Sequence, residues 1–334
     1  ILFTGNPKLK DLVQKYKLNL TDQEKEFIDK KVDNLCLTVN ESQVMKDRDL
    51  SQESWDYIKN NKFFGLCIPE KYSGLGFSAY AHSQVVTKVS SHSGTLGVSV
   101  MVPNSLGPGE LLLNYGTEEQ KNKYLNPLAE GKIVPCFGLT GPSSGSDAAS
   151  MPDIGKVVFK DGVKGVEVKL NKRYITLAPI ADVIGIAFKL EDPDGLLEKG
   201  EEGITLALIG RNTEGLEIGK RHDPIGNAFM NGPIKTDKIF VKMEDIIGGE
   251  ERSGYGWNML MECLAEGRGV SLPASAVGGM KILSNSVGGF ARIRKQFKIP
   301  IAKMEGIQEK LADMVKDTYT ITASQELMNA MLLQ

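Results

Sequence analysis

One block of the chain, residues 135–247, carries strand signals with no long helical period between them, and it limits the fold more than any other feature. Residues 166–170 alternate apolar and polar side chains, and the preceding Asp161-Gly162 pair is typical of a hairpin turn. Asp192-Pro193-Asp194-Gly195 separates two further apolar runs. Because repeated βαβ units need a helix between successive strands, the block favours antiparallel pairing and disfavours a doubly wound sheet.

Helical signals flank this block on both sides. Residues 21–24 (Thr-Asp-Gln-Glu) and 117–120 (Thr-Glu-Glu-Gln) have the capping-box pattern that begins helices, and each precedes a periodic apolar run. Apolar residues return at helical spacing between 307 and 318, with charged residues on the opposite face. The sequence therefore predicts an α+β fold in three parts: helices over residues 1–134, strands over 135–247, and helices over 248–334.

Charge and cysteine usage exclude several classes of function. The 334 residues carry 40 basic and 42 acidic side chains, a net charge of −2, so there is no basic surplus for nucleic acid. The four cysteines are scattered with no CxxC pair, which indicates reduced thiols in a cytoplasmic protein. Only three histidines are present, so we expect no multi-histidine metal site. We find neither a signal peptide nor a run of 18 apolar residues.

A loop rich in glycine and serine, residues 138–147, follows a strand-like run and offers backbone N–H groups and hydroxyls without side-chain bulk. Such a loop suits a phosphate or a flat polar ring, although an ordinary turn has the same composition. A dinucleotide-binding GxGxxG pattern is absent, which excludes a Rossmann cofactor site.

Three further patterns are candidate binding features. Tyr174 and Thr176 share one face of a predicted strand and together suit a planar heterocycle, or they belong to an ordinary half-buried strand. Residues 281–310 hold seven Lys or Arg against two Glu, a cluster that suits a pyrophosphate or forms a solvated face. Arg268 lies between two glycines in an apolar stretch, as an anion clamp or as a structural arginine.

Taken together, three segments in order resemble the acyl-CoA dehydrogenase family. They are residues 64–76 (FGLCIPEKYSGLG), residues 115–125 (YGTEEQKNKYL) and residues 139–147 (LTGPSSGSD). The resemblance runs along essentially the whole chain. Details at residues 103–112, 172–179 and 262–269 are similar to the large bacterial fatty-acid β-oxidation branch of that family.

The resemblance implies a fold and a cofactor. It implies an N-terminal helical domain, a middle antiparallel β-barrel and a C-terminal helical bundle that is incomplete here, with FAD held between the last two. By position in the family's motifs, the FAD-binding residues would be Phe137, Gly138, Leu139, Thr140, Ser146, Tyr174, Ile175, Thr176, Arg294, Lys295 and Gln296. Tyr174 replaces the family's usual tryptophan and would stack on the flavin. Ser146 and Arg268 would also lie near the acyl-CoA, and the residues at 294–296 would reach FAD phosphate across a dimer interface.

The resemblance also implies an activity: α,β-dehydrogenation of a fatty acyl-CoA to the trans-2-enoyl-CoA, with electrons passed to an electron-transfer flavoprotein. It implies a homodimer or larger assembly in the cytoplasm, with possible association with the inner membrane through segments outside this chain. Two alternatives remain open at this point. One is a flavin- or acyl-CoA-binding protein of the same fold without turnover. The other is an acyl-CoA oxidase or flavin monooxygenase on the same scaffold.

The catalytic base is the point at which this chain departs from the family pattern. In some long-chain members the base glutamate occupies the position of Gly267, and glycine cannot remove a proton. Glu266 is adjacent, but neighbouring helix residues point about 100° apart. The sequence therefore predicts no catalytic residue within the chain. We expect the base beyond Gln334, just as the start at Ile1 suggests that residues precede it.

Overall fold

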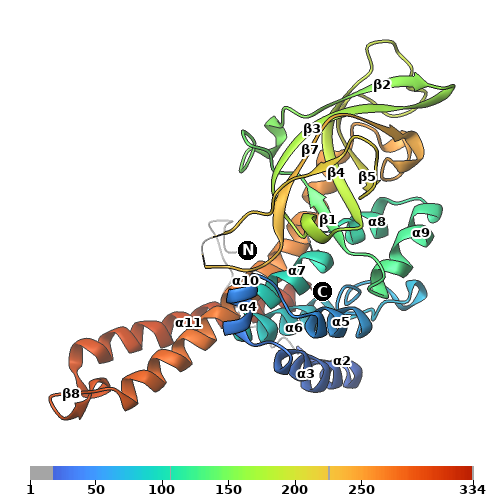
Figure 1. The fold of residues 1–334 in the computed structure, drawn as a ribbon. Helices are drawn as coiled ribbons and strands as arrows, with labels where there is room; N and C mark the ends of the chain where they lie inside the picture. The colour runs from blue at the N-terminus through green and yellow to red at the C-terminus, as the bar shows by residue number, and fades with distance from the viewer. Residues whose placement is uncertain (1–17, 106, 225, 333–334) are drawn as a thin grey trace, which may run out of the picture.

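The computed structural model describes residues 18–105, 107–224 and 226–332 and arranges them in the predicted order of helices, sheet and helices (Figure 1). One apolar core runs from the N-terminal helices through the sheet to the beginning of the long helix that follows it. The predicted α+β class, with helices before and after a sheet, is thereby confirmed.

The N-terminal part is built of helices, of which α6 and α7 carry the most buried residues. Its helices are α2 (Asp22–Glu26), which continues through a π-helical turn (Phe27–Val32) into α3 (Asp33–Leu37), then α4 (Glu41–Asp47), α5 (Gln52–Asn60), α6 (Ala79–His92), α7 (Gly94–Ser105), α8 (Pro108–Tyr115) and α9 (Glu118–Ala129). Both predicted capping boxes are present, since the Thr21 and Thr117 hydroxyls accept from the backbone N–H groups of Glu24 and Gln120. Helix α7 is apolar on nearly every side and is buried.

The middle part is a curled seven-stranded sheet. Its strands are β1 (Pro135–Gly138), β2 (Ile154–Lys160), β3 (Val163–Thr176), β4 (Val183–Glu191), β5 (Gly203–Gly210), β6 (Glu217–Ile218) and β7 (Asn231–Lys242). They are ordered β1-β4-β2-β3-β7-β6, with β5 paired to β4. The predicted hairpin turn joins β2 to β3, and both Asp161 and Gly162 have the positive φ that such turns require.

The expectation of uniformly antiparallel pairing was wrong for two contacts, because β1 and β2 both pair with β4 in parallel. A parallel pair needs a long connection but not a helical one. Here the β2–β3 hairpin itself forms most of the connection between β1 and β4. The absence of a helical period therefore excluded βαβ units without excluding parallel neighbours.

The C-terminal part consists of two long helices, α10 (Gly256–Ile293) and α11 (Glu305–Leu332), joined through the short strands β8 (Lys295–Gln296) and β9 (Ile299–Pro300). The first turns of α10 pack on α6, α7 and the sheet. The far half of α10 pairs with α11 in an arm that projects from the body (Figure 1). Helix α11 returns to the body, where Gln325 and Asn329 donate hydrogen bonds to Ser83 on α6.

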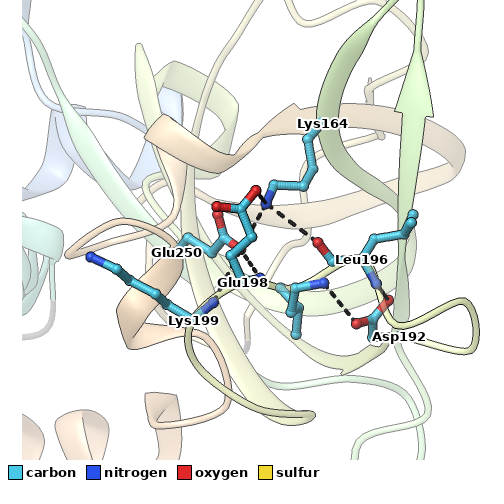
Figure 2. Close-up of polar contacts among 7 residues, drawn as sticks. Lys164, Asp192, Leu196, Glu198, Lys199 and Glu250 are labelled. Atoms are coloured by element: carbon cyan, nitrogen blue, oxygen red, sulfur yellow. Dashed lines mark hydrogen bonds and ion pairs between the residues drawn. The ribbon is translucent and has the colours of Figure 1, made fainter.

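A polar cluster ties the loop between β4 and β5 to the segment that leads into α10 (Figure 2). Lys164 on β3 bonds to Glu198 at 3.0 Å and to Glu250 at 2.9 Å, and Glu250 also accepts from the backbone N–H of Glu198. Asp192 closes the loop on itself by accepting from two backbone N–H groups. The cluster fixes the end of the sheet relative to the start of α10.

Candidate active site

All three parts of the chain meet at one cavity of about 130 Å³. It is lined by Val102 from α7, Phe137 from β1, Leu139 and Thr140 from the loop after β1, Tyr174, Ile175 and Thr176 from β3, and Leu264 and Arg268 from α10. Seven residues that the sequence pointed to for cofactor or substrate therefore surround one space. The cavity combines an aromatic ring, two threonine hydroxyls and a guanidinium with apolar walls, which suits a flat ligand with polar edges.

The loop that carries Leu139 and Thr140 is held by two successive residues of β3. Lys172 is completely buried and donates from Nζ to the Leu139 carbonyl at 3.0 Å and to Asp153 at 2.6 Å. The backbone N–H of Arg173 donates to the Thr140 carbonyl at 2.9 Å. Burial lowers the pKa of Lys172, although the Asp153 charge and hydrogen bond oppose that shift. The buried Lys172–Asp153 ion pair thus holds the loop that forms one wall of the cavity.

Tyr174 occupies an irregular position in β3. The register between β3 and β7 shifts between Lys172 and Ile175, and Tyr174 has φ of +61°, a conformation uncommon for a residue with a Cβ. The residue is 56% exposed. The Arg173 guanidinium lies 4.8 Å from the ring centroid, and the His222 ring lies 4.9 Å away at 52°. The bulge presents the ring at the cavity instead of burying it in the sheet.

Two residues that the sequence did not single out for this site lie directly behind Tyr174 and Thr176. Asn231, the first residue of β7, is buried and donates from Nδ2 to the Tyr174 carbonyl at 3.0 Å and to Thr176 Oγ1 at 3.3 Å. Its Oδ1 lies 2.8 Å from His222 Nδ1. Neither residue belongs to a recognisable motif: the pairing of β3 with β7 brings Asn231 to the site, and the backbone N–H of His222, which donates to the Asn231 carbonyl, brings His222 beside it.

Five of the residues predicted to bind FAD or substrate do not line this cavity. Gly138 is buried within β1 against Lys172, and Ser146 is exposed on the loop beyond Thr140. Arg294, Lys295 and Gln296 lie exposed at the tip of the arm. Because α10 rises about 1.5 Å per residue, Arg294 is about 39 Å along the helix from Arg268. Within one chain, the basic tip and the cavity are therefore separate.

A second, larger cavity of about 260 Å³ lies among the N-terminal helices and also reaches α10. His82 lines it and is 3% exposed, and its Nε2 has no hydrogen-bond partner. Burial lowers the pKa of His82 to about 4, so the imidazole is neutral at pH 7. Asn104, Glu110 and Asn114 add further polar groups to a wall that is otherwise largely apolar.

Gly267 lies at the boundary of this second cavity and has no room for a side chain. A Cβ there would meet the Ser105 carbonyl oxygen at 2.4 Å and a carboxylate oxygen of Glu110 at 3.1 Å. The position where some long-chain family members carry a base is therefore closed to any larger residue. The side chain of Glu266 lies outside the described part of the structure.

The described residues hold neither a cluster of metal ligands nor a membrane-spanning helix. Across residues 18–332, apart from positions 106 and 225, no three His, Cys, Asp or Glu side chains gather where they would hold a metal ion. In that same part of the chain, no helix combines the length and the apolar character needed to cross a membrane.

Three family models match the chain in sequence order. The N-terminal domain of acyl-CoA dehydrogenase matches residues 17–132, the middle domain matches residues 136–239, and the C-terminal domain matches residues 254–330. These segments correspond to the helical, sheet and helical parts of the fold.

Individual proteins agree with the family models. A 3-(aryl)acrylate reductase of Clostridium sporogenes is 33% identical over 91% of this chain and 74% of its own length. The CarC subunit of a caffeyl-CoA reductase–Etf complex of Acetobacterium woodii is 31% identical over 81% of this chain and 68% of its own length. The structure of an acyl-CoA dehydrogenase complexed with FAD from Bacillus anthracis superposes with a TM-score of 0.81 at 24% identity, covering 94% of this chain and 51% of that one.

Proposed function

The chain belongs to the acyl-CoA dehydrogenase family, whose members are FAD-linked oxidoreductases acting on CH–CH bonds, and from this premise we propose that it dehydrogenates a fatty acyl-CoA to the trans-2-enoyl-CoA in β-oxidation. In this proposal the electrons pass to an electron-transfer flavoprotein. The single observation that carries it is the cavity at which all three parts of the chain meet.

The residues around this cavity suit the isoalloxazine ring of FAD. Tyr174 offers an exposed aromatic face, and Thr140 and Thr176 offer hydroxyls to polar ring atoms. Leu139 and Leu264 contribute apolar side chains to the wall. When bound, the flavin supplies hydride chemistry, while the protein supplies binding and orientation.

Arg268 is the residue of this site that we assign to the thioester end of the substrate. It lines the same cavity from α10, one residue from the wall of the second cavity. A guanidinium at that place would stabilise the negative charge that develops on the thioester oxygen when the α-proton leaves. Position 267 supplies no base: glycine has no side chain, and its surroundings leave no space for a carboxylate.

The second cavity is the proposed pocket for the acyl group. Consecutive residues of α7 and of α10 line the two cavities, Val102 and Arg268 the first, Pro103 and Gly267 the second. A mostly apolar wall suits a fatty chain. Its neutral His82 and its amide and carboxyl groups also suit an acyl group that carries a polar substituent.

A second candidate activity is reduction of an α,β-unsaturated thioester, the reverse reaction. The polar groups in the second cavity favour it, and the two relatives above are named as an arylacrylate reductase and a caffeyl-CoA reductase subunit. The electron-transfer flavoprotein is proposed as partner in either direction, since one relative belongs to an Etf complex.

The remaining proposals concern assembly and location. Arg294, Lys295 and Gln296 are proposed to contact FAD phosphate in a second copy of the chain, which their exposure at the arm tip permits. A dimer or larger assembly follows from that proposal. A cytoplasmic protein that associates with the inner membrane remains an expectation from the family resemblance.

The test is reduction of bound FAD by thioesters in the full-length protein without oxygen. Saturated acyl-CoA substrates from butyryl to palmitoyl should bleach the flavin absorbance, and an electron-transfer flavoprotein should restore it faster than air. If only unsaturated aryl thioesters reoxidise the chemically reduced flavin, the reductase activity replaces the dehydrogenase. Rapid recovery in air alone would indicate an oxidase, and binding of FAD without any reaction would indicate a protein without turnover.

A further inference from the structure

We propose that Asn231 is a positioning residue that makes the Thr176 hydroxyl a hydrogen-bond donor toward the cavity between β1, β3 and α10. This inference rests on the proposed function only for the identity of the acceptor, an electron-rich atom at the edge of the FAD ring. The hydrogen-bond directions themselves follow from the protein's own groups.

The orientation of the Asn231 amide is fixed by its backbone partner. The Tyr174 carbonyl oxygen can only accept a hydrogen bond, so the amide group 3.0 Å away must be Nδ2. Nδ2 carries two hydrogens, and the second points to Thr176 Oγ1 at 3.3 Å. A flipped amide would place oxygen against oxygen at the Tyr174 contact and would leave a buried group without its partner.

The opposite end of the amide fixes the state of His222. With Nδ2 toward β3, Oδ1 faces His222 Nδ1 at 2.8 Å. Because an amide oxygen only accepts, Nδ1 must carry a hydrogen. The chain of donors then runs in one direction, from His222 to Asn231 and from Asn231 to Thr176.

The consequence lies at Thr176. Its oxygen already accepts from Asn231, so its own hydrogen is free to turn away from Asn231, and the side chain borders the cavity. Donors that are linked in one direction polarise one another, which strengthens the last one. Thr176 therefore has its hydrogen available to donate to a ligand in the cavity.

Asn231 also supports the strained residue beside it. Tyr174 has a positive φ at the bulge in β3, and its carbonyl is held by Asn231 within the paired strand β7. Strain of this kind persists only when the surroundings hold it. One side chain thus holds both the Thr176 hydroxyl and the backbone of Tyr174.

The test compares Asn231→Asp in two backgrounds of the full-length protein. Aspartate has the same shape but can only accept, so Thr176 would turn its hydrogen toward residue 231 and offer lone pairs to the cavity. Thr176→Ser keeps the hydroxyl and Thr176→Val removes it. We expect Asn231→Asp to weaken FAD binding about tenfold in the wild-type and Thr176→Ser backgrounds, with a shift in the flavin absorbance. In the Thr176→Val background the loss should shrink to less than about threefold.

Equal losses in the Ser and Val backgrounds would overturn the proposal, because Asn231 would then act on the site without the hydroxyl. Comparing the Thr176→Ser and Thr176→Val backgrounds cancels any effect of Asn231→Asp on Tyr174, because that effect is the same in the two backgrounds. A second measurement needs no cofactor: the 15N shifts of the labelled His222 ring should report a hydrogen on Nδ1. A neutral His222 ring protonated on Nε2 would contradict the donor direction, whether or not the protein binds FAD. A wild type that binds no FAD, with Nδ1 of His222 protonated, would overturn the proposed function and leave the donor direction standing.

Discussion

At the scale of single residues, Gly267 shows how a missing side chain can define a site. The glycine lets α10 approach the Ser105 carbonyl of α7, and a Cβ would meet that oxygen at 2.4 Å. Gly269, two residues along the same helix, has open space around the equivalent position. The two glycines therefore differ in packing although the local sequence is nearly symmetric around Arg268.

We predict opposite effects of alanine at these two positions. Gly267→Ala should destabilise the protein by about 1–3 kcal/mol, because the helix must move from α7. Gly269→Ala should stabilise it by up to about 1 kcal/mol, because alanine is the better helix former. Urea unfolding of both variants provides the measurement. Equal effects in the two variants would show that α10 does not pack on α7 as closely as described.

His82 predicts a pH dependence of stability. Its folded-state pKa of about 4 lies below the ordinary value of 6.5 because the ring is buried. Between these values the unfolded chain binds the proton and the folded chain does not, so stability is lost as the pH falls from 6.5 toward 4. The loss relative to a His82→Leu variant should be roughly 3 kcal/mol. Parallel denaturation curves at several pH values test this, and a constant difference between the two proteins would contradict it.

Sequence reasoning identified some residues of the cavity and missed others for a physical reason. Thr140, Tyr174 and Thr176 belong to short contiguous patterns, so the sequence indicated them directly. Asn231 reaches the site through the pairing of β7 with β3, which joins positions more than 50 residues apart, and His222 reaches it through its hydrogen bonds with Asn231. Such pairings leave no local signal.

At the scale of elements, the loop after β1 depends on the ion pair beneath it. Lys172 and Asp153 are 0% and 1% exposed, and Lys172 also holds the Leu139 carbonyl. Removing one partner leaves the other charge buried without compensation. The loop and strand therefore act as one unit in forming the cavity wall.

Lys172→Met should destabilise the protein by about 3–5 kcal/mol. Lys169→Met, three residues earlier on β3, is the matched control, since its ion pair with Asp237 is exposed and is worth at most about 1 kcal/mol. Thermal unfolding distinguishes them. Similar unfolding temperatures for the two variants would mean that the buried pair does not hold the loop.

The polar cluster around Glu250 predicts a second pH effect (Figure 2). Burial alone would raise the pKa of Glu250, but hydrogen bonds from Lys164 and from the backbone of Glu198, with the Lys164 charge, lower it below its ordinary 4.5. A depressed carboxyl pKa contributes stability above 4.5 that is lost as the pH falls through the folded value. Glu250→Gln should therefore cost about 1–3 kcal/mol at pH 7 and progressively less below pH 4.5. A cost that is unchanged at pH 3 would exclude the ionised carboxylate as its source.

At the scale of the whole molecule, the order of helices, strands and helices was predictable because each period of hydrophobicity marks its element. The curled sheet with two parallel neighbours was not, since strand order depends on contacts between distant segments. The arm of α10 and α11 likewise follows from packing: only the first part of α10 and the end of α11 reach the body. The basic cluster predicted at 281–310 lies on this arm.

The central claim is that the cavity between β1, β3 and α10 binds the flavin, and an absorbance titration with FAD tests it most directly. The full-length wild type should bind one FAD per chain. Thr140→Tyr, which fills the cavity from its loop, should weaken binding at least about tenfold, or ~1.4 kcal/mol. Thr213→Tyr adds the same ring at a separate hollow on the sheet domain and should bind as wild type does. A wild type that retains no FAD, or a Thr140→Tyr variant with wild-type affinity, would contradict the account.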